Sequence, residues 1–404
     1  MVEGIEVIED GTVTTPRGFN AGAIHVGVRT DWDKLDVGIV ASEVPCAAAA
    51  TYTQNRVPGA SLVMSKQHLS NGKAQAVVAN AVCANAATGQ QGMADAIQMA
   101  QLTAQKLGID PHDVVVASTG VIGTYLPMDR IGPGIERMAL VADGGLDFAR
   151  AIMTTDTVAK HVAVKSGDWS VGGVVKGVGM IHPNMATMLC FMTTDANVAQ
   201  PFLAAALKKA VNASFNMIDV DSDTSPDDIA LVLANGFAGG TQIDDGHPEA
   251  PAFEKALELV CITLARKMVS DAEGATKVIQ AKVEGAASLE DARKAAREII
   301  RSVGVKTAIY GQDPNWGRVL SAVGNSGAAV VEEKISLYFR MPDGREICVF
   351  SGAPLQYDAA EAKSCLAPAE VHIRVEMGLG QGEATAWGSD LTEEFVRLNS
   401  VYTT

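Results

Sequence analysis

Positive charge is scarce in this sequence. Its 32 Lys and Arg residues face 47 Asp and Glu residues, so the formal net charge is −15. Proteins that bind nucleic acid or anionic membranes gain affinity from basic patches, so we expect neither as a partner. The 48% hydrophobic fraction over 404 residues is ample for a large core. We expect a globular protein that must hold any anionic small molecule with a few local cations.

Clustered metal ligands and long apolar runs are also missing. The six cysteines contain no Cys-x-x-Cys pair, and the seven histidines do not cluster at ligand spacing, so we expect free thiols and no metal ion. No segment reaches the ~18 apolar residues that a membrane span needs. The acidic start, Met-Val-Glu-Gly-Ile-Glu, does not resemble a signal peptide, which favours a cytoplasmic protein.

Hydrophobic periodicity predicts several amphipathic helices. Apolar residues recur at helical spacing through residues 93–107 and stop at Gly108, which tolerates a left-handed helix cap. A second helix has Pro201 in its first turn, and a third runs through residues 253–268. Ser288, with Asp three residues later, is typical of an N-cap and predicts a fourth helix.

Strand patterns alternate with these helices and dominate the last third of the chain. Residues 335–341 and 371–377 alternate apolar and polar side chains, and a Pro-Asp-Gly turn leads from the first run into residues 347–350. The glycine cluster at residues 378–382 lies between two predicted strands, so it lacks the helix that a dinucleotide-binding loop requires. The pattern predicts an α/β protein whose last part is rich in strands.

The segment at residues 176–190 is the most unusual in the chain and reads Lys-Gly-Val-Gly-Met-Ile-His-Pro-Asn-Met-Ala-Thr-Met-Leu-Cys. Its glycines permit unusual backbone angles, and Pro183 restrains His182. In a strained backbone the hydroxyl of Thr187 can attack the carbonyl of Ala186. Hydrolysis of the resulting ester frees a threonine α-amine, which can act as a base at neutral pH. From composition alone, an ordinary turn that enters a buried strand remains the favoured interpretation.

This segment resembles the self-cleavage site of the ornithine acetyltransferases, which are glutamate N-acetyltransferases of arginine biosynthesis. Further stretches that resemble the family occur in order along nearly the whole chain, at residues 15–19, 117–123, 151–156, 271–277, 306–308, 313–318, 387–392 and 399–404. Because the series is long and collinear, the chain is identified as a member of this family. The interpretation of Thr187 as a nucleophile then becomes the favoured one.

The resemblance implies a role for individual residues. Cleavage between Ala186 and Thr187 would expose Thr187 as the nucleophile, and Thr119 with Gly120 would form the oxyanion hole. The substrate-binding residues that the resemblance implies are Thr154, Lys176, Thr187, Glu273, Asn399 and Thr404. In such a site, Lys176 suits an amino-acid carboxylate. Glu273 suits an ammonium group of the substrate or of Thr187.

The resemblance also implies a fold and an assembly. We expect a layered αββα sandwich with a smaller C-terminal α+β lobe. Self-cleavage would give an alpha chain of residues 1–186 and a beta chain of residues 187–404. In the beta chain, residues 187–285 would complete the catalytic core and residues 286–404 would form the smaller lobe. Two copies of each chain would form an α2β2 assembly.

The implied reaction is a ping-pong transfer through an acetyl-threonine. N-acetylornithine would acetylate the Oγ atom of Thr187, and glutamate would accept the acetyl group. The reaction needs no metal or organic cofactor. Bifunctional members of the family also use acetyl-CoA as an acetyl donor, so we expect acetyl-CoA as a substrate only.

Two stretches depart from the family pattern and leave alternatives open. Residues 81–83 read Ala-Val-Cys where the family often has Ser-Gly-Asn. Pro226, Asp227 and Ile229 replace Thr, Asn and Thr. A related acyltransferase of a secondary pathway would keep the same core. An amidase or aminopeptidase of the same fold would use water as the acceptor, and a non-catalytic protein would keep only the scaffold.

Overall fold

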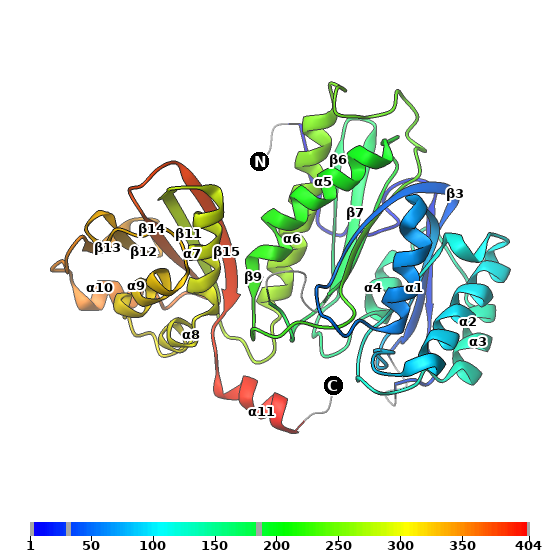
Figure 1. Ribbon diagram of the computed structural model, residues 1–404, viewed down its shortest axis with the longest axis horizontal. Coiled ribbons are helices and arrows are strands. Elements are labelled where there is room, and N and C mark those ends of the chain that lie inside the picture. The colour runs from blue at the N-terminus through cyan, green and yellow to red at the C-terminus, as the bar shows by residue number, and fades with distance from the viewer. Residues whose placement is uncertain (1–3, 30–33, 183–187, 402–404) are drawn as a thin grey trace.

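The computed structural model describes residues 4–29, 34–182 and 188–401. Ala186, Thr187 and Thr404, which the sequence analysis singles out, lie outside these ranges. The described chain forms a larger and a smaller lobe, each built on one sheet (Figure 1). None of its helices combines the length and apolar character needed to cross a membrane.

The larger lobe contains a nine-stranded sheet in the order β1-β6-β7-β8-β10-β3-β4-β5, with β2 paired to β3. Its strands are β1 (Glu6–Ile8), β2 (Phe19–Ile24), β3 (Val37–Tyr52), β4 (Lys73–Asn80), β5 (Val114–Ser118), β6 (Lys160–Ser166), β7 (Trp169–Lys176), β8 (Leu189–Thr194) and β10 (Ile229–Ala234). Helices of this lobe are α1 (Ala60–His68), α2 (Gly89–Leu107), α3 (Met128–Arg137), α4 (Gly145–Ala151), α5 (Gln200–Ala213) and α6 (Ala250–Ser270).

The long strand β3 divides this sheet into two layers. Its first half pairs with β2 and β4, and its last residues pair with β10, with a register irregularity against β4 between Ala41 and Cys46. Irregularities of this kind bend a strand and increase its twist. One sheet half therefore contains β2, β4 and β5, and the other contains β1, β6, β7, β8 and β10.

Alternation of side chains along the strands shows that the two halves pack face to face. Val77 of β4 and Leu231 of β10 belong to one buried cluster between the halves. The next residue on β4, Val78, packs in a different cluster with Met99 of α2, and Met192 of β8 packs with residues of α5 and α6. The layers run helix, sheet, sheet, helix, which confirms the expected αββα sandwich (Figure 1).

The smaller lobe contains a six-stranded sheet in the order β13-β12-β14-β11-β15-β9. Its strands are β9 (Ile218–Asp219), β11 (Val278–Ala286), β12 (Ser336–Arg340), β13 (Glu346–Ser351), β14 (Glu370–Glu376) and β15 (Gly382–Ser389). The helices that follow β11 are α7 (Leu289–Arg301), α8 (Val303–Tyr310), α9 (Trp316–Asn325), α10 (Ala359–Ser364) and α11 (Glu393–Val401). This sheet with its helices is the expected C-terminal α+β lobe.

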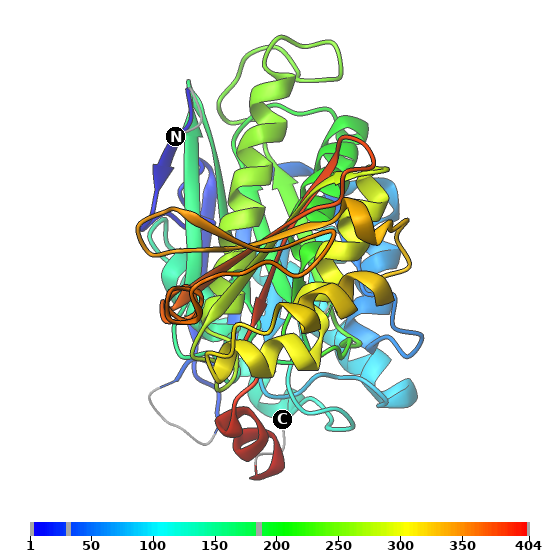
Figure 2. The same cartoon turned by 90° about the vertical axis from the view of Figure 1, so that its left-hand side faces the viewer.

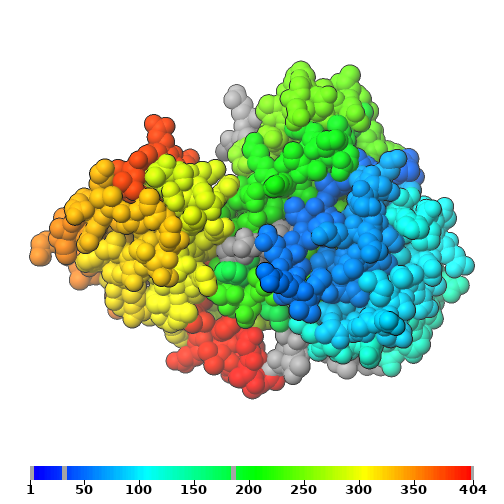
Figure 3. Space-filling view, in the orientation of Figure 1, coloured from blue at the N-terminus to red at the C-terminus, as the bar shows by residue number. Residues whose placement is uncertain are grey.

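The last helix, α11, leaves the smaller lobe and extends below both sheets (Figures 1 and 2). In the space-filling view its residues lie at the lower edge between the two lobes (Figure 3). The smaller sheet includes β11, which ends at residue 286. The cleavage products and the lobe boundary at residue 286 stay predictions.

Several local predictions are confirmed. Helix α2 ends at Gly108, which has a φ of 70°, and Ser288 accepts a hydrogen bond from the backbone N–H of Asp291 at the start of α7. The glycine cluster at residues 378–382 leads from β14 to β15 and not to a helix. These features are determined by residues close together in the chain, which explains why they could be predicted.

We predict that Phe148→Ala weakens the packing between the two sheet halves. The Phe148 ring is fully buried and meets the ring of Phe191 at a centroid distance of 5.5 Å with edge geometry. Its removal should lower the free energy of unfolding by about 3–5 kcal/mol, measured by chemical denaturation. Val303→Ala, at an exposed position, is the control and should leave the value nearly unchanged. Equal losses in both variants would contradict this account of the core.

Candidate active site

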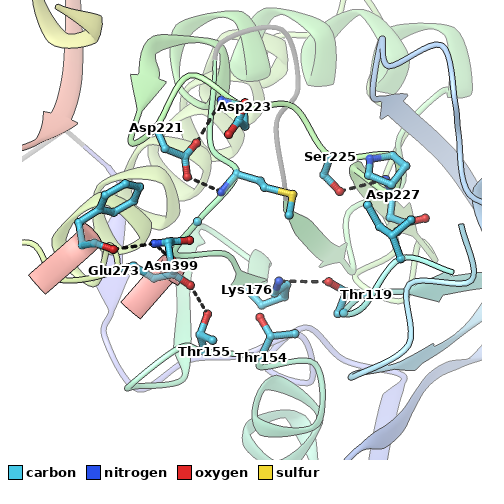
Figure 4. Close-up of a pocket in the computed structure, with 16 residues that line it drawn as sticks. Thr119, Thr154, Thr155, Lys176, Asp221, Asp223, Ser225, Asp227, Glu273 and Asn399 are labelled. Carbon is cyan, nitrogen blue, oxygen red and sulfur yellow. Dashed lines mark hydrogen bonds between the residues drawn. The ribbon is translucent and has the colours of Figure 1, made fainter. Parts of the chain in front are cut away.

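A cavity of about 290 Å³ lies where the larger lobe, the segment that follows β9 and helix α11 meet (Figure 4). Its described lining residues are Thr119, Gly120, Ile122, Thr154, Thr155, Lys176, Gly179, Met180, Asp221, Asp223, Ser225, Pro226, Asp227, Glu273, Phe395 and Asn399. This set contains six of the nine predicted site residues. The other three, Ala186, Thr187 and Thr404, lie outside the described residues.

Lys176 is the only cation among the described lining residues. It stands at the end of β7, is 3% exposed, and its Nζ donates a hydrogen bond to Thr119 Oγ1 at 3.1 Å. Burial lowers the pKa of the Lys176 ammonium, while the carboxylates of Asp156, Asp228 and Glu273 act in the opposite direction. Lys176 is thus a desolvated cation, which attracts an anionic group more strongly than a surface lysine does.

The backbone at Gly120 requires a glycine. Its φ is 130°, and a Cβ there would lie 2.1 Å from the carbonyl carbon of Val82. The neighbouring N–H groups are used, because Thr119 donates to Asn80 O and Val121 donates to Val82 O. The described part of the chain supplies no acceptor for the N–H of Gly120 itself. A backbone N–H without a described partner, next to the Thr119 hydroxyl, is compatible with the expected oxyanion hole, which stays a prediction.

Val82 also shapes the backbone around Gly120. The sequence analysis did not single out this residue. It has a φ of 78°, a left-handed conformation that is unfavourable for a β-branched residue. Its carbonyl accepts the hydrogen bond from Val121. The departure from the family pattern at residues 81–83 therefore lies directly behind Gly120. A glycine in the family pattern at position 82 was the sequence signal for this conformation.

Glu273 connects the larger lobe to α11 across the cavity. Its Oε1 accepts a hydrogen bond from Thr155 Oγ1 at 2.7 Å, and its Oε2 accepts one from Asn399 Nδ2 at 3.0 Å. Thr154, the neighbour of Thr155, lines the same wall. The sequence analysis missed Thr155, and the Thr-Thr pair in the motif at residues 151–156 was the only signal for it.

A buried ion network supports this wall from behind. The Nζ of Lys160 lies 2.6 Å from a carboxylate oxygen of Asp156 and 2.6 Å from one of Asp271. Asp156 also accepts hydrogen bonds from the N–H groups of Thr154 and Gly177, the residue after Lys176. Burial raises the pKa of Asp156, but the charges of Lys160 and Lys176 outweigh it, so the pKa lies below its usual value. The network thereby fixes Lys176 and Thr154 relative to each other.

Aspartates hold the backbone on both sides of residues 183–187. Asp221 accepts hydrogen bonds from the N–H groups of Met180 and Ile181 at 2.6 and 3.0 Å. Asp228 accepts one from the N–H of Met188 at 2.8 Å. Burial raises the pKa of Asp221 to about 6, although its hydrogen bonds oppose this. The segment between β9 and β10 thus fixes the described residues that precede and follow the predicted junction.

Groups of three or more His, Cys, Asp or Glu side chains that could hold a metal ion do not occur in the described ranges. The groups that the described cavity offers to a substrate are one cation, several carboxylates and two hydrogen-bond donors, the Thr119 hydroxyl and the Gly120 N–H. The expectation that no cofactor is needed stays a prediction.

Comparison with known proteins identifies the family. A family model described as the ArgJ family matches residues 20–404. The chain belongs to the ArgJ family. Among curated proteins, this ArgJ-family chain is 46% identical to the arginine biosynthesis bifunctional protein ArgJ of Dehalococcoides mccartyi, with 100% of both chains covered. It is 48% identical to the protein of the same name from Symbiobacterium thermophilum, with 98% of this chain and 99% of the relative covered.

Two solved structures are also similar to parts of this ArgJ-family chain. The arginine biosynthesis bifunctional protein ArgJ of Bacillus halodurans is 40% identical over 52% of this chain and 97% of the solved chain, with a TM-score of 0.49. An ornithine acetyltransferase of Mycobacterium tuberculosis, solved with ornithine, is 37% identical over 46% of this chain and 100% of the solved chain, with a TM-score of 0.43. The full-length sequence relatives confirm the resemblance and the expected enzyme class, an acetyltransferase of arginine biosynthesis.

We predict that Gly120→Ala disrupts the donor pair of the cavity. The new Cβ would overlap the backbone of Val82, so the loop must move and carry the Gly120 N–H with it. Losing one aligned oxyanion donor should lower kcat about 100- to 1,000-fold, measured by steady-state acetyl transfer. Gly123→Ala is the matched control, because Gly123 also has a positive φ but its Cβ would meet nothing within 4 Å. A similar loss in both variants would contradict a specific role for Gly120.

Proposed function

We propose that this chain cleaves its own backbone between Ala186 and Thr187, and that Thr187 then transfers an acetyl group from N-acetylornithine to glutamate. The observation that carries this proposal is the pairing of Lys176 in β7 with Leu189 in β8. In the sequence, Leu189 follows Thr187 by two residues and is the first residue of β8. The strand that follows the proposed junction is thereby paired with the strand end that carries the cavity's cation.

The cleavage step forms an ester and then breaks it. The Oγ of Thr187 attacks the carbonyl carbon of Ala186, and the peptide C–N bond breaks as the ester forms. Water then hydrolyses the ester, which leaves a carboxylate on Ala186 and a free α-amine on Thr187. Because the pKa of a peptide α-amine is ordinarily about 7.7–8.0, this amine can accept the proton of its own hydroxyl.

The transfer step uses the same oxygen twice. Thr187 Oγ attacks the acetyl carbonyl of N-acetylornithine, and ornithine leaves with the proton that the α-amine accepted. The amine of glutamate then attacks the acetyl-threonine, which releases N-acetylglutamate and restores the hydroxyl. In each half-reaction the negative charge on the carbonyl oxygen is held by the hydroxyl of Thr119 and the N–H of Gly120.

Substrate recognition follows from the charges of the cavity. Lys176 binds the α-carboxylate of the amino acid, and Glu273 binds an ammonium group. Thr154 and Asn399 complete the described part of the site, and Thr404 would add a further contact. Acetyl-CoA serves as a second acetyl donor in this proposal, and no metal or organic cofactor takes part.

The two proposed chains share one sheet. Strand β7 precedes residue 186, its partner β8 follows residue 187, and β10 pairs with both β8 and β3. Cleavage at this point would leave strands of the two products interleaved, so the buried surface between them keeps them together. The proposal includes a cytoplasmic location and an α2β2 assembly of the two chains.

Intact-mass measurement of the purified protein tests the cleavage. We expect two chains, residues 1–186 and 187–404, because the attack on Ala186 requires only the chain itself. Thr187→Ala should remain one chain and lose acetyl transfer. Thr241→Ala, at an exposed threonine, should be cleaved and active. Active enzyme that consists only of the uncut chain would refute the proposal.

Lys176→Met tests recognition of the substrate carboxylate. The variant keeps a long apolar side chain but loses the charge, so KM for N-acetylornithine should rise about 10- to 100-fold, as expected for the loss of a charged hydrogen bond. Steady-state kinetics with N-acetylglutamate as the measured product provides the value. Lys208→Met, at an exposed lysine, is the control. Release of free acetate by the wild type without N-acetylglutamate would instead favour a hydrolase.

A further inference from the structure

Two adjacent carboxyl groups at the entry to β10 take no direct part in the proposed cleavage and transfer steps. Asp227 and Asp228 are 6% and 1% exposed, and Asp227 lines the cavity (Figure 4). Asp228 uses Oδ1 to accept the hydrogen bond from Met188. The Oδ2 of Asp228 and the Oδ1 of Asp227 are buried and have no hydrogen-bond partner among the described residues.

Packing prevents the Asp227 side chain from turning away. A Cβ added to Gly59, the N-cap residue of α1, would lie only 1.9 Å from Asp227 Oδ1. The N–H of Gly59 donates to the carbonyl of Pro226, which fixes the two segments against each other. The carboxyl of Asp227 is therefore enclosed between α1 and the cavity.

The charged groups around the pair cannot compensate two ionised carboxylates. Lys176 in β7 acts on both aspartates, and it also interacts with Asp156 and Glu273. Across the cavity the remaining titratable groups are the acids Asp221 and Asp223. Helix α1 presents its N-terminus at Gly59, which supplies only a partial positive charge. Burial raises the pKa of both Asp227 and Asp228 well above the usual value. The charge of Asp227 also raises the pKa of Asp228, so the two acids do not titrate independently.

We propose that Asp227 and Asp228 are a positioning pair of which at least one member is protonated, and that this proton keeps Lys176 available for the carboxylate of the substrate. If both carboxyls were ionised, they would neutralise Lys176 and repel an anionic substrate. With the pair protonated, the cation of Lys176 and the carboxylate of Glu273 match an amino acid with one carboxylate and one ammonium. The inference rests on the proposed function, because it concerns binding of that substrate.

Asp228 also holds the backbone at the start of β8. Its Oδ1 holds the N–H of Met188, and the carbonyl of Met188 accepts a hydrogen bond from the N–H of Ile229. Met188 directly follows the proposed nucleophile. The acceptor function of Asp228 does not need a negative charge, because a neutral acid or an amide also presents a carbonyl oxygen.

The experiment compares Asp227→Asn and Asp228→Asn with the wild type. In each variant the new amide is close in shape to a protonated aspartate and cannot ionise, so the pair can carry at most one negative charge. We expect both to be cleaved, and we expect their KM for N-acetylornithine below neutral pH to stay within about threefold of the wild-type value, since one neutral group replaces another. As the pH rises, the wild-type KM should increase about tenfold or more when the pair loses its proton, and the variants should lose most of this increase.

Two further variants separate the outcomes. Asp228→Ala removes the acceptor for Met188, so cleavage measured by intact mass should slow at least about tenfold relative to Asp228→Asn. Asp245→Asn, at an exposed aspartate, should keep the wild-type pH profile. Folding of each variant is checked by circular dichroism, and the Asn variants keep the test decisive if the Ala variant does not fold.

The pair proposal is overturned if folded Asp227→Asn and Asp228→Asn both show a KM raised more than about tenfold at every pH, because the pair would then be acting as anions. A wild-type KM that does not change with pH overturns it as well. Failure of the proposed function looks different, because the wild type itself would then remain one chain or form no N-acetylglutamate.

Discussion

The antiparallel pairing of β7 with β8 is the interaction on which the site depends. It places Lys176 opposite Leu189 and so brings the cation of the cavity to the strand that begins after the predicted junction. Strand β8 is held on its other side by β10, which carries Asp228 at its entry. A shift of this register by one residue would move the side chains of β7 to the opposite face of the sheet and so remove Lys176 from the cavity.

Charge in this molecule is distributed with strong local contrasts. The net charge is −15, yet the cavity contains a buried lysine. Behind the cavity wall Lys160 lies between Asp156 and Asp271, so one cation serves two carboxylates and Asp156 also interacts with the charge of Lys176. On the other side of the cavity, a protonated Asp227–Asp228 pair would place less negative charge beside Lys176 than two ionised carboxylates. The buried cation is tolerated because carboxylates lie close to it, and the low dielectric of the protein interior strengthens their attraction.

Backbone conformation is the second requirement of the site. Gly120 and Val82 both have positive φ values, and their segments contact each other through the Val121 hydrogen bond. Such conformations persist only where the surrounding structure holds them. Here the surrounding structure is the parallel pair β4 and β5, whose ends at Asn80 and Ser118 lie next to each other. The donors of the proposed oxyanion hole are thus aligned before any substrate arrives.

The sequence by itself determined the α/β class and the local elements, because a helix cap such as Ser288 or an alternating strand such as residues 371–377 depends on neighbours in the chain. The family and the layered arrangement followed from the resemblance of its motifs. Six of the nine predicted site residues share one cavity. They had been predicted from the resemblance of their motifs to the family, and not from local sequence patterns. Only the tertiary structure decided that Lys160 is a buried ion partner, that Thr155 and Asn399 meet at Glu273, and that Asp227 and Asp228 are enclosed without enough positive charge. The physical reason is that burial and charge compensation depend on residues distant in the chain, and no local pattern contains them.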